Sequence, residues 1–359
     1  MRKRFILGLL VSAVFIYLAF RKIDFLQMWQ ALQQANYLWL FPAVGCMFIS
    51  LWLRAIRWGY FMGPIKPGIG LHKLFAAMMI GYYGNNVFPL RAGEVLRAYA
   101  IGKSAGVSRM AAFATIFVER LIDVLALLLL IGFSVIFHDY PGWIKKGSMV
   151  IFMLTAAAII FMVALMLHTQ KTLRLMSRLT RPFPEKLQQF VSKLLGSFLE
   201  GFTIFKKTEH FWAITWQSVV IWLLYAAVNY ATLEAFALND QLPIGASFVI
   251  LVIVNISIML PAAPGYVGTF HLACKEAVAL FGVSDSTALS FALVLHIANF
   301  IPITLVGFIY FYREQLSLSD AVAAERQAAE GQAGEELEPT PQKQSSPLSR
   351  EKRRENQRV

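Results

Sequence analysis

Long apolar stretches constrain this sequence more than any other feature. They cover residues 5–20, 37–62, 110–137, 148–168, 211–238 and 286–312. A helix needs about 20 mainly apolar residues to cross a hydrocarbon core of about 30 Å. The first stretch follows the basic start Met1-Arg2-Lys3-Arg4, but no small-residue cleavage pattern comes after it, so we interpret it as a retained span. The predicted fold class is therefore all-α and polytopic, with six full membrane spans.

Composition and charge also indicate a membrane protein. The chain is 57% hydrophobic and 15% charged, whereas an average soluble domain is about a quarter charged. Residues 1–312 contain 25 basic and 12 acidic side chains, and residues 313–359 contain 8 and 9. A body that is both apolar and basic fits a membrane protein and argues against a soluble enzyme, a disordered chain or a disulfide scaffold. We expect Cys46 and Cys274 to be unpaired, because they are far apart in the sequence.

Two shorter apolar stretches, 74–89 and 246–261, end in helix-breaking motifs instead of charge clusters. Helix breakers at membrane depth survive only where protein or a wet cavity satisfies the freed backbone groups. We therefore predict two re-entrant helical hairpins. The alternative is that each stretch is an ordinary span that ends in a turn. The breakers are Pro89 and Gly93 in the first motif, and Pro261, Pro264, Gly265 and Gly268 in the second.

The order span, span, hairpin, span occurs twice with similar spacing. Pro89 comes 52 residues after residue 37, and Pro261 comes 50 residues after residue 211. In the predicted topology the second copy starts from the opposite side of the membrane, as in the inverted repeats of transporters, whose sites lie between the broken helices. Residues 169–210 contain eight Lys or Arg, which places this loop and both termini in the cytoplasm, with Arg54 and Arg57 on the same side. The predicted location is a bacterial inner membrane.

Several charged residues fall at predicted membrane depth. Glu119 and Asp123 are four residues apart and share a helix face, with Arg120 turned about 100° away. Charges at this depth are costly, so they face a bundle interior, pair or contact a substrate. The nearest cations that the sequence suggests are Arg91 and Arg97, and arginine suits phosphate recognition. The alternative is a salt-bridge network that joins hairpin and span.

The second hairpin offers Tyr266, Thr269 and His271 within its motif instead of a cation. His296 and Asn299 are three residues apart and can face one cavity, although a lone intramembrane histidine is more often structural. Lys275 and Glu276 are adjacent and are expected to point apart. The candidate substrate-binding residues are Asn86, Arg91, Glu94, Arg97, Glu119, Arg120, Asp123, Tyr266, His296 and Asn299.

No catalytic motif stands out. The sequence has no Walker loop, no HExxH, no Gly-x-Ser-x-Gly and no Cys/His cluster. We therefore expect no enzyme activity, no cofactor, no metal and no nucleic-acid partner. Residues 169–210 are predicted to form a basic amphipathic segment on the cytoplasmic surface, or alternatively a helical hairpin packed on the bundle. Residues 313–359 are predicted to be a disordered cytoplasmic tail, which leaves residues 1–312 as one transmembrane domain.

Three motifs resemble those of a known family. They are Pro89-Leu90-Arg91-Ala92-Gly93-Glu94, Glu119-Arg120-Leu121-Ile122-Asp123 and Pro261-Ala262-Ala263-Pro264-Gly265-Tyr266-Val267-Gly268. Over about residues 5–312 the chain resembles the lysylphosphatidylglycerol synthase transmembrane-region family, also called flippase-like domain or UPF0104 proteins. The resemblance implies lipid translocation, as in the flippase half of bifunctional aminoacyl-phosphatidylglycerol synthases. Aminoacyl transfer is not implied, because no soluble synthase domain follows Tyr312. The acid that many members have after the second proline is also absent.

The sequence thus supports one main function and two alternatives. The main hypothesis is a flippase-like transporter of an anionic phospholipid, glycolipid or polyprenyl/hopanoid-type lipid. In it Arg91, Arg97 and Arg120 hold the headgroup while Glu119 and Asp123 orient them. One alternative is a non-transporting membrane subunit that recruits a lipid-modifying glycosyltransferase. The other is an intramembrane enzyme that acts on a lipid phosphate. The expected partners are lipids with anionic headgroups and, in the second case, a lipid-modifying enzyme.

Overall fold

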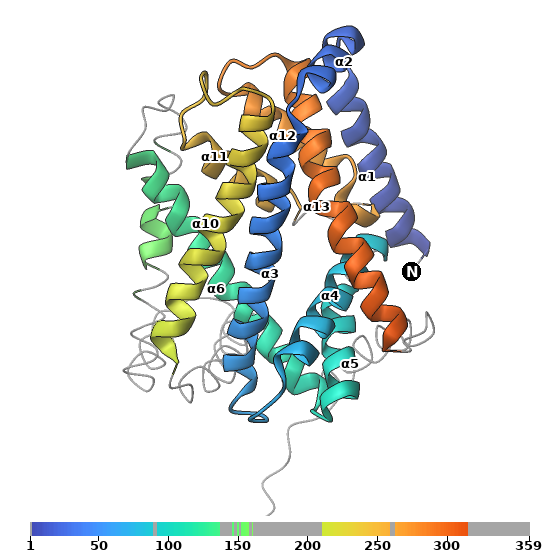
Figure 1. Ribbon diagram of the computed structural model, residues 1–359, viewed down its shortest axis with the longest axis vertical. Helices are drawn as coiled ribbons and strands as arrows, with labels where there is room; N and C mark the ends of the chain where they lie inside the picture. Colours follow the sequence, from blue (N-terminus) through green and yellow to red (C-terminus); the bar gives the residue numbers. More distant parts are fainter. Residues whose placement is uncertain are drawn as a thin grey trace, which may run out of the picture.

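The computed structural model describes residues 2–88, 92–136, 146, 149–150, 152–157, 160, 210–258 and 263–314, and no strand occurs among them. The main helices run side by side as a bundle (Figure 1). In chain order the elements are α1 (Arg2–Phe20), α2 (Phe25–Gln34), the 3-10 turn η1 (Tyr37–Trp39), α3 (Leu40–Met62), α4 (Leu71–Val87), α5 (Gly93–Ala105), α6 (Arg109–Ile136), α10 (Phe211–Ala235), α11 (Ala246–Ser257), the 3-10 turn η3 (Pro264–Tyr266), α12 (Thr269–Ala279) and α13 (Asp285–Arg313). The predicted all-α class is confirmed for this part of the chain.

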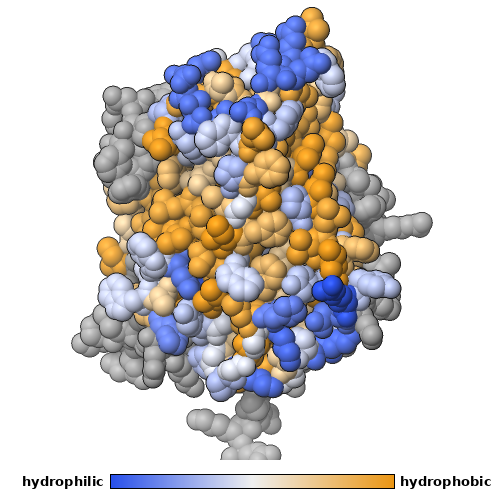
Figure 2. Space-filling view, in the orientation of Figure 1, coloured by the Kyte–Doolittle hydropathy of each residue, from blue (hydrophilic) through white to orange (hydrophobic). Residues whose placement is uncertain are grey.

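Three segments of the described chain are long and apolar enough to cross a membrane. They are Tyr37–Met62, which joins η1 to α3, and the helices α10 and α13. Large apolar side chains on their outer faces are exposed, among them Phe41, Trp212 and Leu305. Figure 2 shows an apolar band across the middle of the molecule with hydrophilic residues gathered toward both ends. This distribution is the one expected of a bundle surrounded by lipid.

The remaining predicted spans have different outcomes. The first predicted span, 5–20, corresponds to α1, whose apolar part Leu10–Phe20 is short. The third predicted span, 110–137, corresponds to α6. Most of the predicted span 148–168 lies outside the described residues, as do the basic segment up to residue 209 and the tail from residue 315. Cys46 and Cys274 are free, as predicted.

The stretch before the first break forms α4, and α5 follows it as a close-packed neighbour. A Cβ atom on Gly93, the first residue of α5, would collide with the carbonyl oxygen of Gly81 in α4. The N–H of Gly93 also donates to Oδ1 of Asn85 at 3.0 Å. Only glycine allows this approach of two backbones. Pro89 and Arg91 lie outside the described residues.

The second break has its own geometry. After α11 the described chain resumes in η3, where Gly265 and, just beyond, Gly268 have φ values of 70° and 93°. Both values lie in the left-handed region that glycine enters without steric cost. The N–H of Ala263 donates to Oγ of Ser12 in α1 at 2.8 Å, so α1 holds this turn from outside. Pro261 lies outside the described residues.

The two breaks meet against α13. In Figure 1 the α4/α5 pair occupies the lower part of the bundle and the α11/α12 pair the upper part. Asn86, at the end of α4, donates from Nδ2 to Oγ1 of Thr304 in α13 at 2.8 Å. A Cβ on Gly265 of η3 would lie 3.5 Å from the carbonyl oxygen of Asn86 and 2.7 Å from the ring of Phe300 in α13. Backbone from each break therefore lies next to the other.

A short sequence recurs after each pair of helices. Gly106-Val107-Ser108 follows α5 and Gly282-Val283-Ser284 follows α12, with residue numbers that differ by 176. Both glycines are left-handed, with φ values of 62° and 83°. Ser108 and Ser284 then accept the N–H of the residue three positions later, at 3.4 and 3.3 Å. The first residues of α5 and α12, Gly93 and Thr269, also differ by 176.

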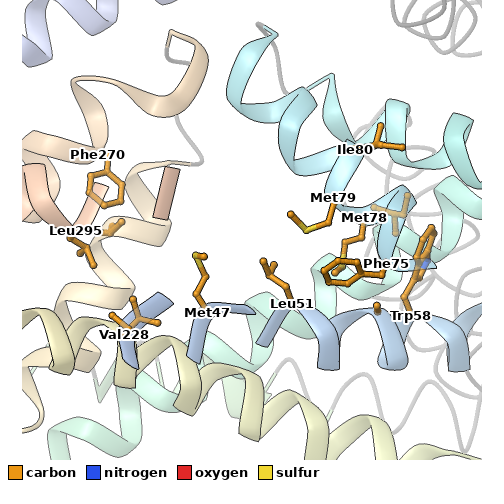
Figure 3. Packing of buried hydrophobic residues seen from close by; sticks show 14 of the residues in the cluster. Met47, Leu51, Trp58, Phe75, Met78, Met79, Ile80, Val228, Phe270 and Leu295 are labelled. Atoms are coloured by element: carbon orange, nitrogen blue, oxygen red, sulfur yellow. The ribbon is translucent and has the colours of Figure 1, made fainter. Parts of the chain in front are cut away.

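Apolar side chains along α3 link the two pairs. Figure 3 shows Met47, Leu51 and Trp58 in a row on α3, with Phe75 and Met79 of α4 toward the Trp58 end. Val228, Phe270 and Leu295, from α10, α12 and α13, lie toward the Met47 end. All belong to one buried cluster. Through this core α3 packs against α4 of the first pair and against α10 and α13.

Candidate functional site

Two carboxylates on α6 form the centre of a buried ionic cluster. Glu119 and Asp123 come ten and fourteen residues after Arg109, the first residue of the helix. At 1.5 Å per residue they stand about 15 and 21 Å along it. Their exposed fractions are 0% and 5%. The helix face that the sequence predicts for them is therefore turned into the bundle.

Three arginines from two other helices pair with these carboxylates. Arg54 of α3 donates from Nη1 to Glu119 Oε1 at 3.1 Å and to Asp123 Oδ2 at 2.8 Å. Arg57, one turn later on α3, donates from Nη2 to Asp123 Oδ1 at 2.6 Å. Arg97 of α5 donates from Nη2 to Glu119 Oε2 at 2.7 Å. We refer to these five side chains as the ionic cluster.

Neighbouring groups hold the arginines in place. Arg57 also donates from Nη1 to Oγ of Ser218 in α10 at 2.8 Å. The guanidinium carbon of Arg97 lies 3.9 Å from the centroid of the Trp58 ring, which is a cation–π contact. Trp58 in turn donates from Nε1 to Oγ1 of Thr115 at 3.0 Å. Four helices, α3, α5, α6 and α10, thus determine where the charges lie.

The ionic cluster has one positive charge more than it has negative charges. Three guanidinium groups face two carboxylates, and all five side chains are buried. Among the described residues, no hydrogen-bond partner is present for the buried Nε atoms of Arg54, Arg57 and Arg97. Burying an uncompensated charge in a low-dielectric interior is costly. The arrangement can therefore accept one further negative charge and offers N–H donors for its oxygens.

Sequence analysis missed two members of this cluster. The charge pattern assigns Arg54 and Arg57 to the cytoplasmic side and names Arg91 and Arg97 as the nearest cations to Glu119 and Asp123. The structure instead shows Arg54 and Arg57 buried inside the bundle, with exposed fractions of 3% and 0%, where both pair with these carboxylates. The available signal was their spacing of three within an apolar stretch that continues to Met62. Arg97 is a partner as predicted, and Arg91 lies outside the described residues.

A second ion pair lies at the edge of the cluster. Arg120 Nε is 3.2 Å from Glu94 Oε1 on α5, and Arg120 Nη1 is 3.9 Å from Asp123 Oδ2. These side chains are more accessible, with exposed fractions of 36% for Arg120 and 28% for Glu94. The pair is neutral and leaves the excess charge of the cluster unchanged. It lies between the buried charges and the surface of the described bundle.

The second break brings two histidines together. His296 of α13 and His271 of α12 have ring centroids 4.7 Å apart and perpendicular planes. His296 Nε2 lies 2.9 Å from the carbonyl oxygen of Gly265, and His271 Nδ1 accepts the N–H of Gly268 at 3.3 Å. His296 also stacks on Phe270 at 4.7 Å. His296 is therefore not a lone histidine, and its neighbour His271 was noted at the second hairpin but was not among the predicted binding residues.

The other residues that the sequence singled out form only local contacts or none with the two clusters described above. Asn299 donates to the carbonyl oxygen of Leu295 in its own helix at 2.8 Å. Tyr266 is half-buried in η3, and its φ of 58° is unusual for a residue other than glycine. Lys275 and Glu276 do not point apart, because their charged groups lie 3.0 Å from each other. Among the described residues, no group of three or more His, Cys, Asp or Glu side chains could hold a metal ion.

Two polar positions of α6 and α13 have the same place in their helices. Arg120 is the twelfth residue of α6, and His296 is the twelfth residue of α13. Asp123 and Asn299 are each the fifteenth. The same shift of 176 residues relates the Gly-Val-Ser turns that precede these helices. A charged position in the first half thus corresponds to a neutral or titratable one in the second.

Apolar spans, broken helices and a buried ionic cluster define a helical membrane protein. The chain belongs to the family described as the lysylphosphatidylglycerol synthase TM region, which matches residues 5–307. The resemblance inferred from the three motifs is therefore confirmed.

Relatives support the same class. A UPF0104 membrane protein of Methanothermobacter thermautotrophicus is 26% identical over 298 residues, which cover 77% of this chain and 86% of the relative. UPF0104 membrane protein MJ1595 of Methanocaldococcus jannaschii is 22% identical over 73% of this chain and 80% of its own length. Glycosyltransferase AglD of Haloferax volcanii is 22% identical over 75% of this chain but only 47% of its own length. No solved structure matches this chain significantly.

Proposed function

We propose that this protein translocates an anionic lipid across the membrane, with the headgroup bound at the ionic cluster. The observation that carries the proposal is the excess of one buried positive charge. A monoanionic phosphodiester would balance it, and the free Nε–H groups could donate to its oxygens. A phospholipid, a glycolipid phosphate and a polyprenyl or hopanoid-type lipid with such a group all fit this chemistry.

The proposed architecture has six full spans and two re-entrant hairpins, α4/α5 and α11/α12, in an inverted repeat. The matching Gly-Val-Ser turns, the shared shift of 176 residues and the meeting of the breaks at Asn86 and Gly265 support it. Broken helices that meet in this way are typical of transporter sites. We further propose a bacterial inner membrane location with both termini in the cytoplasm, because basic residues concentrate on that side.

In this proposal the arginines have different roles from those that the sequence suggested. Arg54, Arg57 and Arg97 provide the excess charge, while Glu119 and Asp123 hold them in position. Arg120 and Glu94 are proposed to separate as the headgroup enters, since they are the more exposed pair. Asn86, Tyr266 and Asn299 are proposed to line the junction of the breaks, and Arg91 remains a candidate.

Exchange of labelled lipid between leaflets tests the proposal. The full chain is reconstituted into liposomes that contain fluorescent phosphatidylglycerol or fluorescent phosphatidylcholine, and the outer leaflet is quenched chemically. We expect the anionic phosphatidylglycerol probe to exchange between leaflets faster than the neutral phosphatidylcholine probe. Arg97→Gln removes the excess charge but leaves two arginines against two carboxylates, and we expect about tenfold slower exchange.

Arg313→Gln is the matched control, because it removes an arginine that is exposed at the end of α13. Its exchange rate should equal that of the native protein. Equal rates for native protein and Arg97→Gln, or no exchange of any anionic lipid, would contradict the proposal. Cysteine labelling at Lys103→Cys and Asp240→Cys tests the architecture, since the repeat requires these positions to lie on opposite sides.

The similarity to Glycosyltransferase AglD favours a second candidate function. The match covers only about half of that relative, so the relative contains both a region similar to this chain and a further region of similar length. A chain of this kind could therefore recruit a lipid-modifying glycosyltransferase without moving lipid itself. Co-purification of a glycosyltransferase, together with lipid exchange at the rate of empty liposomes, would favour this candidate.

A further inference from the structure

We propose that His271 and His296 form a proton-binding site at the second break, and that this proton moves in step with the anionic headgroup. The coupling rests on the translocation function proposed above, whereas the protonation does not. The two imidazoles lie 4.7 Å apart where α12 and α13 meet η3. The turn between α11 and α12, residues 258–268, contains no Lys or Arg of its own.

The hydrogen bonds determine the resting tautomer of each ring. A carbonyl oxygen can only accept, so His296 Nε2 must bear hydrogen toward Gly265. A backbone N–H can only donate, so His271 Nδ1 must be unprotonated toward Gly268. Each ring therefore has one nitrogen whose state is set by the backbone. The bond to Gly268 requires a neutral His271, whereas the bond to Gly265 allows His296 to be neutral or protonated.

The geometry points to His296 as the residue that takes up the proton. Protonating His271 at Nδ1 would turn an acceptor into a donor that faces the Gly268 N–H. Protonating His296 at Nδ1 keeps its bond to Gly265 and makes Nε2 a better donor. The imidazolium would also lie on the face of Phe270, as a cation–π contact requires.

The site takes one proton at a time. Two imidazolium rings 4.7 Å apart would repel each other, so the second protonation is opposed. The proton is taken from water on one side and returned to water on the other, without any covalent change. One proton and one monoanionic headgroup together carry no net charge, which lowers the cost of crossing the bilayer.

Among the described residues, the other charged groups on the elements packed around the pair are themselves paired or lie toward helix ends. Arg54 and Arg57 of α3 belong to the ionic cluster, Glu234 lies at the end of α10 and Arg313 at the end of α13. On α12 and α13, Lys275 is paired with Glu276 and Asp285. The helix α11 has no titratable residue, η3 has Tyr266, and α1 has Tyr17 and its basic start. The helix α4 has His72, Lys73, Tyr82 and Tyr83, of which Lys73 donates to a carbonyl oxygen.

The position of the pair allows a proton to influence both breaks. His296 holds Gly265, and Gly265 lies beside the carbonyl oxygen of Asn86 at the end of α4. His271 holds Gly268, whose left-handed turn begins α12. A change in either hydrogen bond would shift η3 against α4, and α4 packs on α5, which provides Arg97.

Two conservative variants remove the proton-binding site while they keep the hydrogen bonds of the turn. His296→Gln keeps a donor toward Gly265, and His271→Asn keeps an acceptor toward Gly268, but neither side chain titrates. The full chain is reconstituted with fluorescent phosphatidylglycerol, and a pH difference of one unit is imposed across the liposome. One proton per lipid predicts up to about tenfold accumulation in one leaflet. Both variants should exchange the lipid without accumulating it, whereas His72→Asn on the exposed part of α4 should behave as native.

A spectroscopic measurement separates the failure of this proposal from failure of the proposed function. The ¹⁵N spectrum of histidine-labelled protein is recorded between pH 8 and 5. Conversion of one of the two rings to imidazolium, lost in His296→Gln, supports the site even if no lipid moves. Accumulation that persists in both variants, or two rings that stay neutral or are charged together, would overturn it.

Discussion

The two helix breaks hold polar groups inside an apolar bundle in different ways. Next to the first break, three arginines and two carboxylates form four ion pairs between 2.6 and 3.1 Å long, with a fifth contact at 3.6 Å. At the second break, two histidines bond to backbone groups of the turn. By the shift of 176 residues, the charged Arg120 of the first half aligns with the titratable His296 of the second. The difference suggests binding at the first break and switching at the second.

The largest expected effect comes from breaking the ionic cluster. Glu119→Gln leaves three buried arginines against one carboxylate, and removal of one partner of a buried pair costs about 3–5 kcal/mol. We expect a correspondingly lower midpoint of thermal unfolding in detergent. Glu276→Gln is the control in the second half, because that carboxylate is 60% exposed and its pair with Lys275 should contribute about 0–1 kcal/mol. Equal losses would remove the contrast between the halves.

The next effect tests how tightly the first break is packed. Gly93→Ala would force its Cβ into the carbonyl oxygen of Gly81 and push α5 away from α4. We expect a loss of about 1–3 kcal/mol from overpacking, measured by chemical or thermal unfolding. The second half has Thr269 at the matching position, so glycine is a requirement of the first half alone.

Gly45→Ala is a suitable control for this change. No atom lies within 4 Å of the added Cβ, and the residue is inside α3. Alanine there should leave stability unchanged or raise it by up to about 1 kcal/mol, because it favours the helix. If both substitutions were neutral, the close approach of α4 and α5 would be refuted.

The smallest effect tests the repeat itself. Ser108→Ala and Ser284→Ala each remove a hydroxyl that accepts the N–H three residues later. Loss of such a cap costs about 0.5–2 kcal/mol. We expect similar losses for the two variants and their sum in the double variant, as measured by thermal unfolding. A loss confined to one of the two positions would weaken the proposed equivalence of α6 and α13.

Much of the fold could be predicted from the sequence, because membrane spans depend on long apolar runs. Predicted stretches 37–62, 211–238 and 286–312 correspond to helices within a few residues, and both proline-glycine motifs do interrupt helices. The site was predicted only in part. Glu119, Asp123 and Arg97 form the expected pairs, but Arg54 and Arg57 were not predicted as partners, because a count of basic residues does not register burial.

The sequence by itself determined that this chain is an apolar helical membrane protein of a known family, where its helices end, and that two carboxylates share one helix face. These properties depend on local patterns of apolar, charged and helix-breaking residues. Only the tertiary structure decided which cations meet the carboxylates and that His271 lies beside His296. Such pairings join helices that are distant in the sequence, and they depend on how each helix is rotated and how closely glycine lets its neighbour approach.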